Sequence, residues 1–150
     1  MRDVNVEQRV TFRAAREADA ETAATLAGEL GYPNEGEMIR ARVRAIGEAD
    51  LLLVAVDASD KAVGFIQAHR VCIIEVGFQV EILGLVVSSS ARRSGIGQRL
   101  IEEAERWAKR IGAEVVSVRS NTKRIEAHTF YPALGYKKIK TQALYEKAVR

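Results

Sequence analysis

Residues 81–111 read EILGLVVSSSARRSGIGQRLIEEAERWAKRI, and this stretch decides the fold. Its first part, Ile82–Val87, is an apolar run of strand length, followed by a turn that contains serine and glycine. From Ile96 to Ile111, apolar residues recur every three or four positions, as on one face of an amphipathic helix. The stretch is therefore predicted to fold as a strand, a turn and a helix.

The turn before this predicted helix has the composition of an anion site. First helical turns usually carry Asp or Glu, because the N-terminus of a helix bears a partial positive charge. Here the turn carries Arg92 and Arg93 and no acid. Gly95 and Gly97 have no side chains where a phosphate would approach backbone N–H groups. Turn-forming glycines and solvated arginines are the alternative interpretation, but their combination after a buried strand favours a pyrophosphate site.

Length, charge and cysteine content bound the class of protein. The chain has 150 residues, enough for one domain with a full core. Its net charge of +3 and 6% aromatic content argue against a nucleic-acid partner and fit an anionic cofactor. Cys72 is the lone cysteine, which excludes an internal disulfide and cysteine-based zinc sites. We expect Cys72 to be buried and inert, and we expect no metal cofactor.

The chain shows no targeting or membrane segment. Met1–Asn5 is polar and lacks the apolar core of a signal peptide. No stretch approaches the roughly 20 apolar residues that span a bilayer. A cytoplasmic protein with no membrane partner is therefore expected.

Periodicity and turn residues predict the remaining elements. Asp19 is expected to cap a helix, and Gly135 to end another in the left-handed conformation. The order is β-α-α-β-β-β-α-β-α-β-β, which implies one α/β domain over residues 1–150, with helices on both faces of a mixed sheet. Strands are expected at 10–14, 51–56, 62–71, most of 71–87, 114–118, 136–139 and 142–145, and helices at 19–30, 37–47, 96–111 and 124–134.

Two motifs resemble those of the GNAT superfamily of N-acetyltransferases. Arg92-Arg93-Ser94-Gly95-Ile96-Gly97 is similar to that family's Arg/Gln-x-x-Gly-x-Gly/Ala pyrophosphate motif. Ala127–Tyr136 is similar to its Ala-x-x-Phe-Tyr-x-x-x-Gly-Tyr/Phe segment, and Ser120–His128 resembles enzymes acting on small amines, including aminoalkylphosphonate and aminoglycoside types. The resemblance covers nearly the whole chain. It implies the GNAT acyl-CoA N-acyltransferase fold, a central mixed, mostly antiparallel sheet flanked by about four helices.

The resemblance implies acetyl-CoA as the acetyl donor. Backbone groups of Leu85 and Val87 would pair with the pantetheine arm as an added strand does. A backbone N–H of the same strand would stabilise the developing oxyanion. The full set of residues that it implies for cofactor binding on this strand and turn is Leu85, Val86, Val87, Arg92, Arg93, Ser94, Gly95, Ile96, Gly97 and Gln98.

Proton transfer needs an acid and a base. Tyr131 matches the family tyrosine that protonates the departing thiolate, and packing beside Phe130 is its alternative role. Glu81 is the candidate base, expected on the same strand face as Leu83, Leu85 and Val87. Leu83 occupies the position where family members more often place the acid. A solvated Glu81, with water acting as the base, therefore remains an alternative.

Three other polar residues are candidates for cofactor or substrate contact. The family's cofactor-contacting asparagine corresponds to Arg124, which either contacts phosphate or faces solvent. Asn121 either reaches the pantetheine amides or caps the next helix. His128 is a candidate substrate contact, whereas His69 has no visible partner and is assigned a structural role.

The resemblance implies an N-acetyltransferase that acts by direct attack of a primary amine, with a small molecule favoured over a protein acceptor. Arg40, Arg42 and Arg44 would favour an acidic or phosphonate-bearing amine unless they only face solvent. A homodimer is expected by analogy with the fold. The alternative function is a non-catalytic acetyl-CoA-binding sensor or regulatory module. A phosphate-loop nucleotidase fits poorly, because no Gly-Lys-Ser/Thr follows the glycines.

Overall fold

The computed structural model describes residues 9–92 and 94–150. The chain divides into two compact units, Met1–Arg119 and Ser120–Arg150. The first unit contains the sheet and three α-helices, and the second contains one α-helix. The expectation that residues 1–150 form a single domain stays a prediction.

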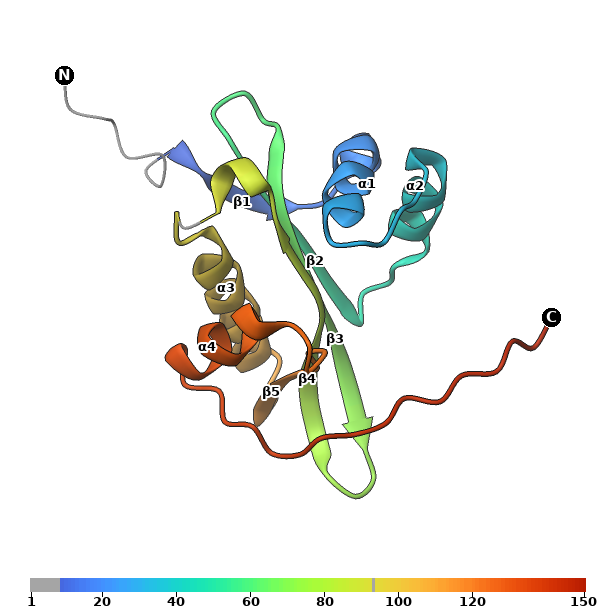
Figure 1. The fold of residues 1–150 in the computed structure, drawn as a ribbon, viewed down its shortest axis with the longest axis vertical. Helices are drawn as coiled ribbons and strands as arrows, with labels where there is room; N and C mark the ends of the chain where they lie inside the picture. Colours follow the sequence, from blue (N-terminus) through green and yellow to red (C-terminus); the bar gives the residue numbers. More distant parts are fainter. Residues whose placement is uncertain (1–8, 93) are drawn as a thin grey trace. The chain divides into compact units, whose positions relative to one another are not determined.

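Five strands of the first unit form one sheet in the order β1-β2-β3-β4-β5 (Figure 1). The pairs β1–β2, β2–β3 and β3–β4 are antiparallel, whereas β4 and β5 are parallel. This confirms the predicted mixed, mostly antiparallel sheet. The strands are β1 (Thr11–Ala14), β2 (Asp50–Val56), β3 (Ala62–Ile73), β4 (Gly77–Val87) and β5 (Val115–Val118).

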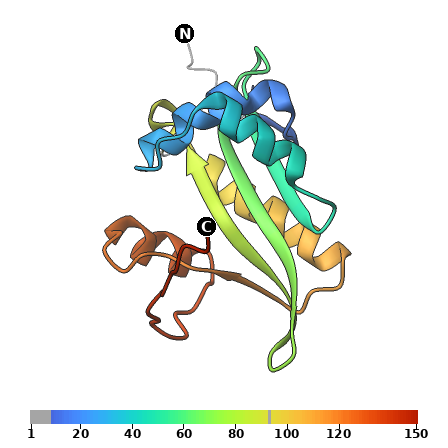
Figure 2. The same ribbon diagram turned by 90° about the vertical axis from the view of Figure 1, so that its right-hand side faces the viewer.

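Helices cover both faces of this sheet, as predicted. Helix α3 (Ile96–Arg110) lies on one face, and α1 (Ala20–Glu29) and α2 (Gly36–Ala45) lie on the other (Figures 1 and 2). The apolar stripe of α3 is buried, with Leu100 fully enclosed. A Cβ built on Gly64 of β3 would lie 2.9 Å from the Val86 carbonyl oxygen, so the glycine is needed for the close approach of the β4 backbone. In the described residues, no helix combines the length and apolar character that crossing a membrane requires.

A β-bulge in β4 changes which side chains share a face. β3 alternates regularly, with Ile66 and Ala68 buried. Its partners on β4 are Leu85 for Ile66 but Ile82 for Ala68, so Leu83 is an extra residue on β4. Directly paired residues share a face, and Glu81 pairs with His69. Glu81 and Leu85 therefore lie on opposite faces, and the prediction that they share one is wrong because the bulge reverses the alternation.

The second unit contains α4 (Ile125–Ala133). Gly135 follows with a φ of +93°, which confirms the predicted left-handed end of this helix. The strands expected at Tyr136–Ile139 and Gln142–Tyr145 are wrong, because the structure has no strand there. Alternating apolar residues form a strand only when a partner strand and a packed face are present. Residues 137–150 are exposed instead.

Cys72 is exposed, which corrects the expectation of a buried thiol. The buried alternation of β3 ends at Ala68, and the strand then continues to Ile73 with exposed and half-buried residues. Apolar neighbours in sequence therefore do not bury Cys72.

Asp19 ties β1 to the start of α1. It occupies the N-cap position of α1 as predicted, but its side chain makes no capping hydrogen bond to that helix. Its carboxylate accepts two hydrogen bonds from the Arg13 guanidinium, both at 2.8 Å, and one from the Arg16 N–H at 2.7 Å. The Arg13 guanidinium holds the pKa of Asp19 below its ordinary value.

Asp19→Asn is expected to lower the free energy of unfolding by about 2 kcal/mol at pH 7, since it removes charged hydrogen bonds. The folded pKa of Asp19 lies below the unfolded one, so this contribution is present above about pH 4. It is lost as the pH falls through the folded value. Urea unfolding from pH 7 to pH 2 measures the difference, with Glu48→Gln, which changes an exposed carboxylate, as the control. Equal stability of wild type and Asp19→Asn at pH 7 would contradict the assignment.

Candidate functional site

The N-terminus of α3 has no side-chain cap. Gly95 precedes the helix with a φ of +81°, a conformation that suits glycine, and makes no side-chain cap. The backbone N–H of Arg99 donates to the Gly95 carbonyl at 3.1 Å. The N–H groups of Ile96, Gly97 and Gln98 precede that bond and have no acceptor within the helix. Because the first turn also has no acidic residue, the positive end of the helix can receive an external anion.

The turn before α3 is held by its own hydrogen bonds. The Ser94 hydroxyl donates to the Ala91 carbonyl, which ends the 3₁₀ turn η3 (Ser89–Ala91). Arg92 is exposed, with its Nε 3.5 Å from the Val87 carbonyl oxygen. The Gln98 side chain donates to Glu102 at 3.0 Å, so its backbone N–H is the group directed at an anion. Arg93, predicted to contribute a backbone N–H, lies outside the described residues.

One edge of β4 is open where the strand leads into this turn. β4 pairs with β3 through Val87, but with β5 only from Gln79 to Ile82. Within the described chain, residues 83–87 therefore have no β5 partner. An extended amide-containing chain can pair with such an edge. The structure thus brings together the predicted residues Leu85, Val86, Val87, Arg92, Ser94, Gly95, Ile96, Gly97 and Gln98 along one strand, turn and helix start.

Glu81, the candidate base, is held in an ion pair that the sequence did not predict. Arg119, directly after β5, lies with its Nε 2.6 Å from Glu81 Oε1. The Glu81 side chain is 19% exposed. The parallel pairing that sets Glu81 opposite Ser117 explains how Arg119 comes within reach.

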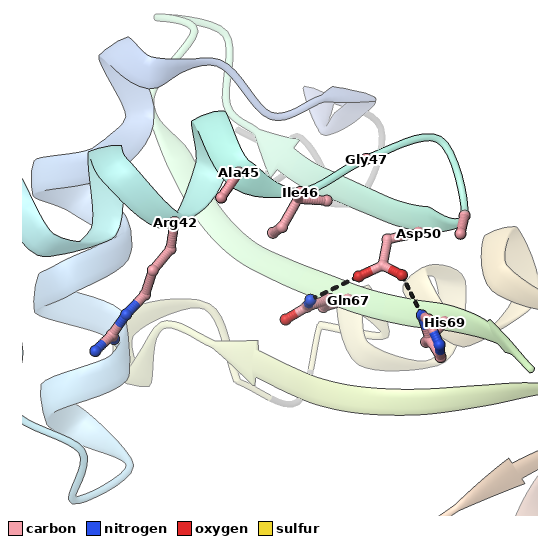
Figure 3. A pocket seen from close by; sticks show the side chains of 8 residues that line it. Arg42, Ala45, Ile46, Gly47, Asp50, Gln67 and His69 are labelled. Atoms are coloured by element: carbon pink, nitrogen blue, oxygen red, sulfur yellow. Dashed lines mark hydrogen bonds and ion pairs between the residues drawn. The ribbon is translucent and has the colours of Figure 1, made fainter. Parts of the chain in front are cut away.

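A pocket of about 530 Å³ lies in the first unit, where β2 and β3 meet the end of α2 (Figure 3). Asp50 Oδ1 accepts a hydrogen bond from His69 Nδ1, and Asp50 Oδ2 accepts one from Gln67 Nε2 at 3.1 Å. The expectation that His69 has no partner is therefore wrong. Counting outward from the Asp57–Lys61 turn pairs Asp50 with Ala68, and a bulge at Val63 brings His69 opposite Asp50 instead. The lining residues are Arg42, Ala45, Ile46, Gly47, Ala49, Asp50, Gln67 and His69.

The three arginines of α2 differ in their partners. Arg40 pairs with Glu37 at 2.8 Å, and Arg44 pairs with Glu17 at 2.6 Å. Arg42 donates to the neutral amide oxygen of Asn34 at 2.7 Å and lines the pocket. Among these arginines, Arg42 is thus the one whose hydrogen-bond partner is neutral.

In the second unit, Tyr131 lies between two aromatic rings. Its ring centroid is 5.0 Å from that of Phe130 and 6.0 Å from that of Tyr136. Burial raises the pKa of Tyr131 above its ordinary value, and the positive charge of Arg124 opposes this rise. Its phenol is therefore protonated at neutral pH. Tyr131 and His128 share one face of α4, because they are three residues apart.

Asn121 forms the turn that leads into α4. Its side-chain oxygen accepts from the Lys123 N–H at 3.0 Å, and its carbonyl accepts from the Arg124 N–H at 2.9 Å. Asn121 thus forms the turn before α4, and it is not the N-cap of that helix as its alternative role would require. Arg124 occupies the N-cap position of α4 and is exposed, as is His128.

Residues 48–138 match the family model described as Acetyltransferase (GNAT) domain. The mixed sheet between helices is thus that of an acetyltransferase domain. The chain belongs to the GNAT family. The predicted family and fold are confirmed.

Individual relatives are similar over different lengths. The aminoalkylphosphonate N-acetyltransferase of Salmonella typhimurium is 44% identical over 57 residues, which are 38% of this chain and 37% of that protein. The chain thus spans about two fifths of the curated relatives that it matches, at 37% and 41% of their lengths.

Two solved structures resemble most of the chain. A transcriptional regulator from Bacillus halodurans C-125 has a TM-score of 0.82 and 26% identity, covering 92% of this chain and 99% of that one. An aminoglycoside N-acetyltransferase in complex with CoA has a TM-score of 0.80 and 20% identity, covering 92% and 94% respectively, and shares the fold.

Proposed function

We propose that this protein transfers the acetyl group of acetyl-CoA to the primary amine of a small molecule. The observation that carries the proposal is the N-terminus of α3, with Gly95 at a φ of +81° and no acid in the first turn, directly after the open edge of β4. The helix start would bind the CoA pyrophosphate, and the edge would pair with pantetheine. These two features fit the two ends of one ligand.

The proposed reaction is a direct attack of the neutral amine on the thioester carbonyl. A backbone N–H of β4 would stabilise the oxyanion as the carbon–nitrogen bond forms. The carbon–sulfur bond then breaks, and Tyr131 would donate its proton to the leaving thiolate as the general acid. Raising the pKa of Tyr131 by burial keeps this proton in place at neutral pH. Glu81 is the base that the sequence predicts. Its carboxylate is held in an ion pair with Arg119, so another residue can serve as the base instead.

We further propose an acceptor amine that carries an acidic group. Arg42 borders the pocket and donates to a neutral amide, whereas Arg40 and Arg44 are paired with carboxylates. The similarity to an aminoalkylphosphonate N-acetyltransferase supports the same chemical class. An anionic amine would bind the Arg42 guanidinium through charged hydrogen bonds.

The test is an acetyl-transfer screen against aminophosphonates, amino acids, polyamines, aminoglycosides and peptides, with calorimetry of CoA binding in parallel. We expect CoA to bind and aminophosphonates to be acetylated with the highest kcat/KM, and polyamines to be at least about tenfold poorer. CoA binding with transfer to polyamines alone would contradict the acceptor class. No detectable CoA binding would contradict the whole proposal.

The second candidate function is a non-catalytic acetyl-CoA sensor. This candidate is supported by the similarity to a solved structure named as a transcriptional regulator. A sensor would be thermally stabilised by acetyl-CoA while consuming none of it with any amine. Retention of the tyrosine motif favours the enzyme.

A cytoplasmic location and a homodimeric assembly complete the proposal. The first is supported by the presence of a single cysteine, which cannot form a disulfide within the chain. The second is supported by analogy with the fold alone.

A further inference from the structure

The sheet register aligns polar side chains across neighbouring strands of the first unit. Asp50 of β2 pairs with His69 of β3, and His69 pairs with Glu81 of β4. Directly paired residues share a face, so the imidazole lies between two carboxylate-bearing residues on one face. α3 packs on the other face, where Ile66 and Ala68 of β3 are buried.

The hydrogen bond to Asp50 fixes the chemistry of the imidazole. An ionised carboxylate is only an acceptor, so Nδ1 of His69 is the donor. In the neutral imidazole, Nε2 is then the atom with an available lone pair. Gln67 holds the second Asp50 oxygen at 3.1 Å, which fixes the carboxylate from both sides (Figure 3). The Asp50 side chain is 15% exposed and that of His69 is 41% exposed. The carboxylate is therefore covered, whereas the imidazole is accessible.

The same pocket lies one strand away from the proposed thioester-binding strand. Its lining residue Gln67 pairs with Gly84, which follows the β4 bulge and belongs to the open edge. Neighbouring strands lie about 4.8 Å apart, and His69 is one pleat, about 7 Å, farther along β3. The residues that line the pocket come from β2, β3 and the end of α2, so an amine held there would extend past His69 and across β4 to reach the thioester on the open edge.

Resting on the proposed function, we infer that His69, positioned by Asp50, is the base that deprotonates the acceptor ammonium. Nε2 takes one proton from R–NH₃⁺, and the resulting R–NH₂ attacks the thioester carbonyl. A second proton leaves the nitrogen as the amide forms. It reprotonates Tyr131, which has given its own proton to the thiolate. The proton on His69 passes to solvent, so the products are the amide, CoA thiol and one proton.

The inference predicts that His69→Gln lowers kcat/KM for an alkylammonium acceptor by about 50-fold. This is less than the hundredfold or more typical of general bases, because water in the open pocket can take the proton instead. An O-alkyl hydroxylamine of the same shape is already neutral at pH 7, so its rate should change less than about threefold. CoA affinity should also stay within about twofold of wild type. Asp50→Asn should show the same preference for the neutral acceptor with a smaller loss.

Cys72→Ser, three residues along the same strand and exposed, is the matched control and should behave as wild type. Equal losses with both acceptors would overturn the inference, since they would indicate a role in positioning. An unchanged rate with the alkylammonium acceptor would also overturn it, provided that wild type turns over. A wild-type protein that binds CoA but acetylates no amine would contradict the proposed function itself.

Discussion

Replacing Gly97 by aspartate is expected to weaken CoA binding by about 100-fold without destabilising the protein. Gly97 is the second residue of α3, where a carboxylate interacts favourably with the helix dipole. The same carboxylate would lie beside the proposed pyrophosphate. Repulsion between the carboxylate and the pyrophosphate, a few ångströms apart near the protein surface, is about 3 kcal/mol, which corresponds to the hundredfold loss. Calorimetry measures the loss of CoA affinity. Thermal unfolding measures the stability, which should stay the same or rise.

Gly97→Asn is the matched control, because asparagine has nearly the shape of aspartate without its charge. We expect it to weaken CoA binding by about tenfold or less. The additional loss in Gly97→Asp should shrink at high salt, since ions screen the repulsion. A folded Gly97→Asp protein with wild-type CoA affinity would exclude α3 as the pyrophosphate site.

Tyr131→Phe is expected to lower kcat by about 1000-fold while the CoA dissociation constant stays within about twofold. The substitution removes one hydroxyl and keeps the ring contacts with Phe130 and Tyr136. Without a proton donor, the thiolate must leave unassisted or be protonated by water, and general acids typically contribute 10²–10⁴-fold. Steady-state kinetics with the best acceptor of the screen, together with calorimetry, separate the two quantities.

The neighbouring Tyr136→Phe removes a hydroxyl from the same aromatic cluster and should change kcat by less than about twofold. The pH dependence gives a second check. Because burial raises the pKa of Tyr131 above its ordinary value of about 10, the phenol stays protonated through about pH 9, and wild-type kcat should not fall between neutral pH and that pH. Full activity of Tyr131→Phe would remove this residue from the mechanism.

Much of the candidate cofactor site could be predicted from the sequence, because its signals are local. The helix face from Ile96 to Ile111, the acid-free first turn and Gly95 all lie within one short segment. Backbone N–H groups at a helix start point along its axis whatever the rest of the chain does. The helix boundaries and the left-handed Gly135 follow from the same local rules.

The acceptor side of the candidate site could not be predicted, because it depends on strand register. The extra residues Val63 and Leu83 each shift the pairing by one position. One such shift brings His69 opposite Asp50, and the other turns Glu81 to the face opposite Leu85. A bulge is a property of two paired strands, and a one-residue slip moves every later side chain to the other face.

The amino-acid sequence alone thus determined the strand, the turn and the helix start that can bind a pyrophosphate, because three or four neighbouring residues set each of these. The tertiary structure decided which charged side chains meet, pairing Asp50 with His69 and Glu81 with Arg119. It also left residues 136–150 without the strands that their apolar pattern predicted. Strands, bulges and ion pairs form between segments distant in the chain, and their free energy is gained only when both partners are in place.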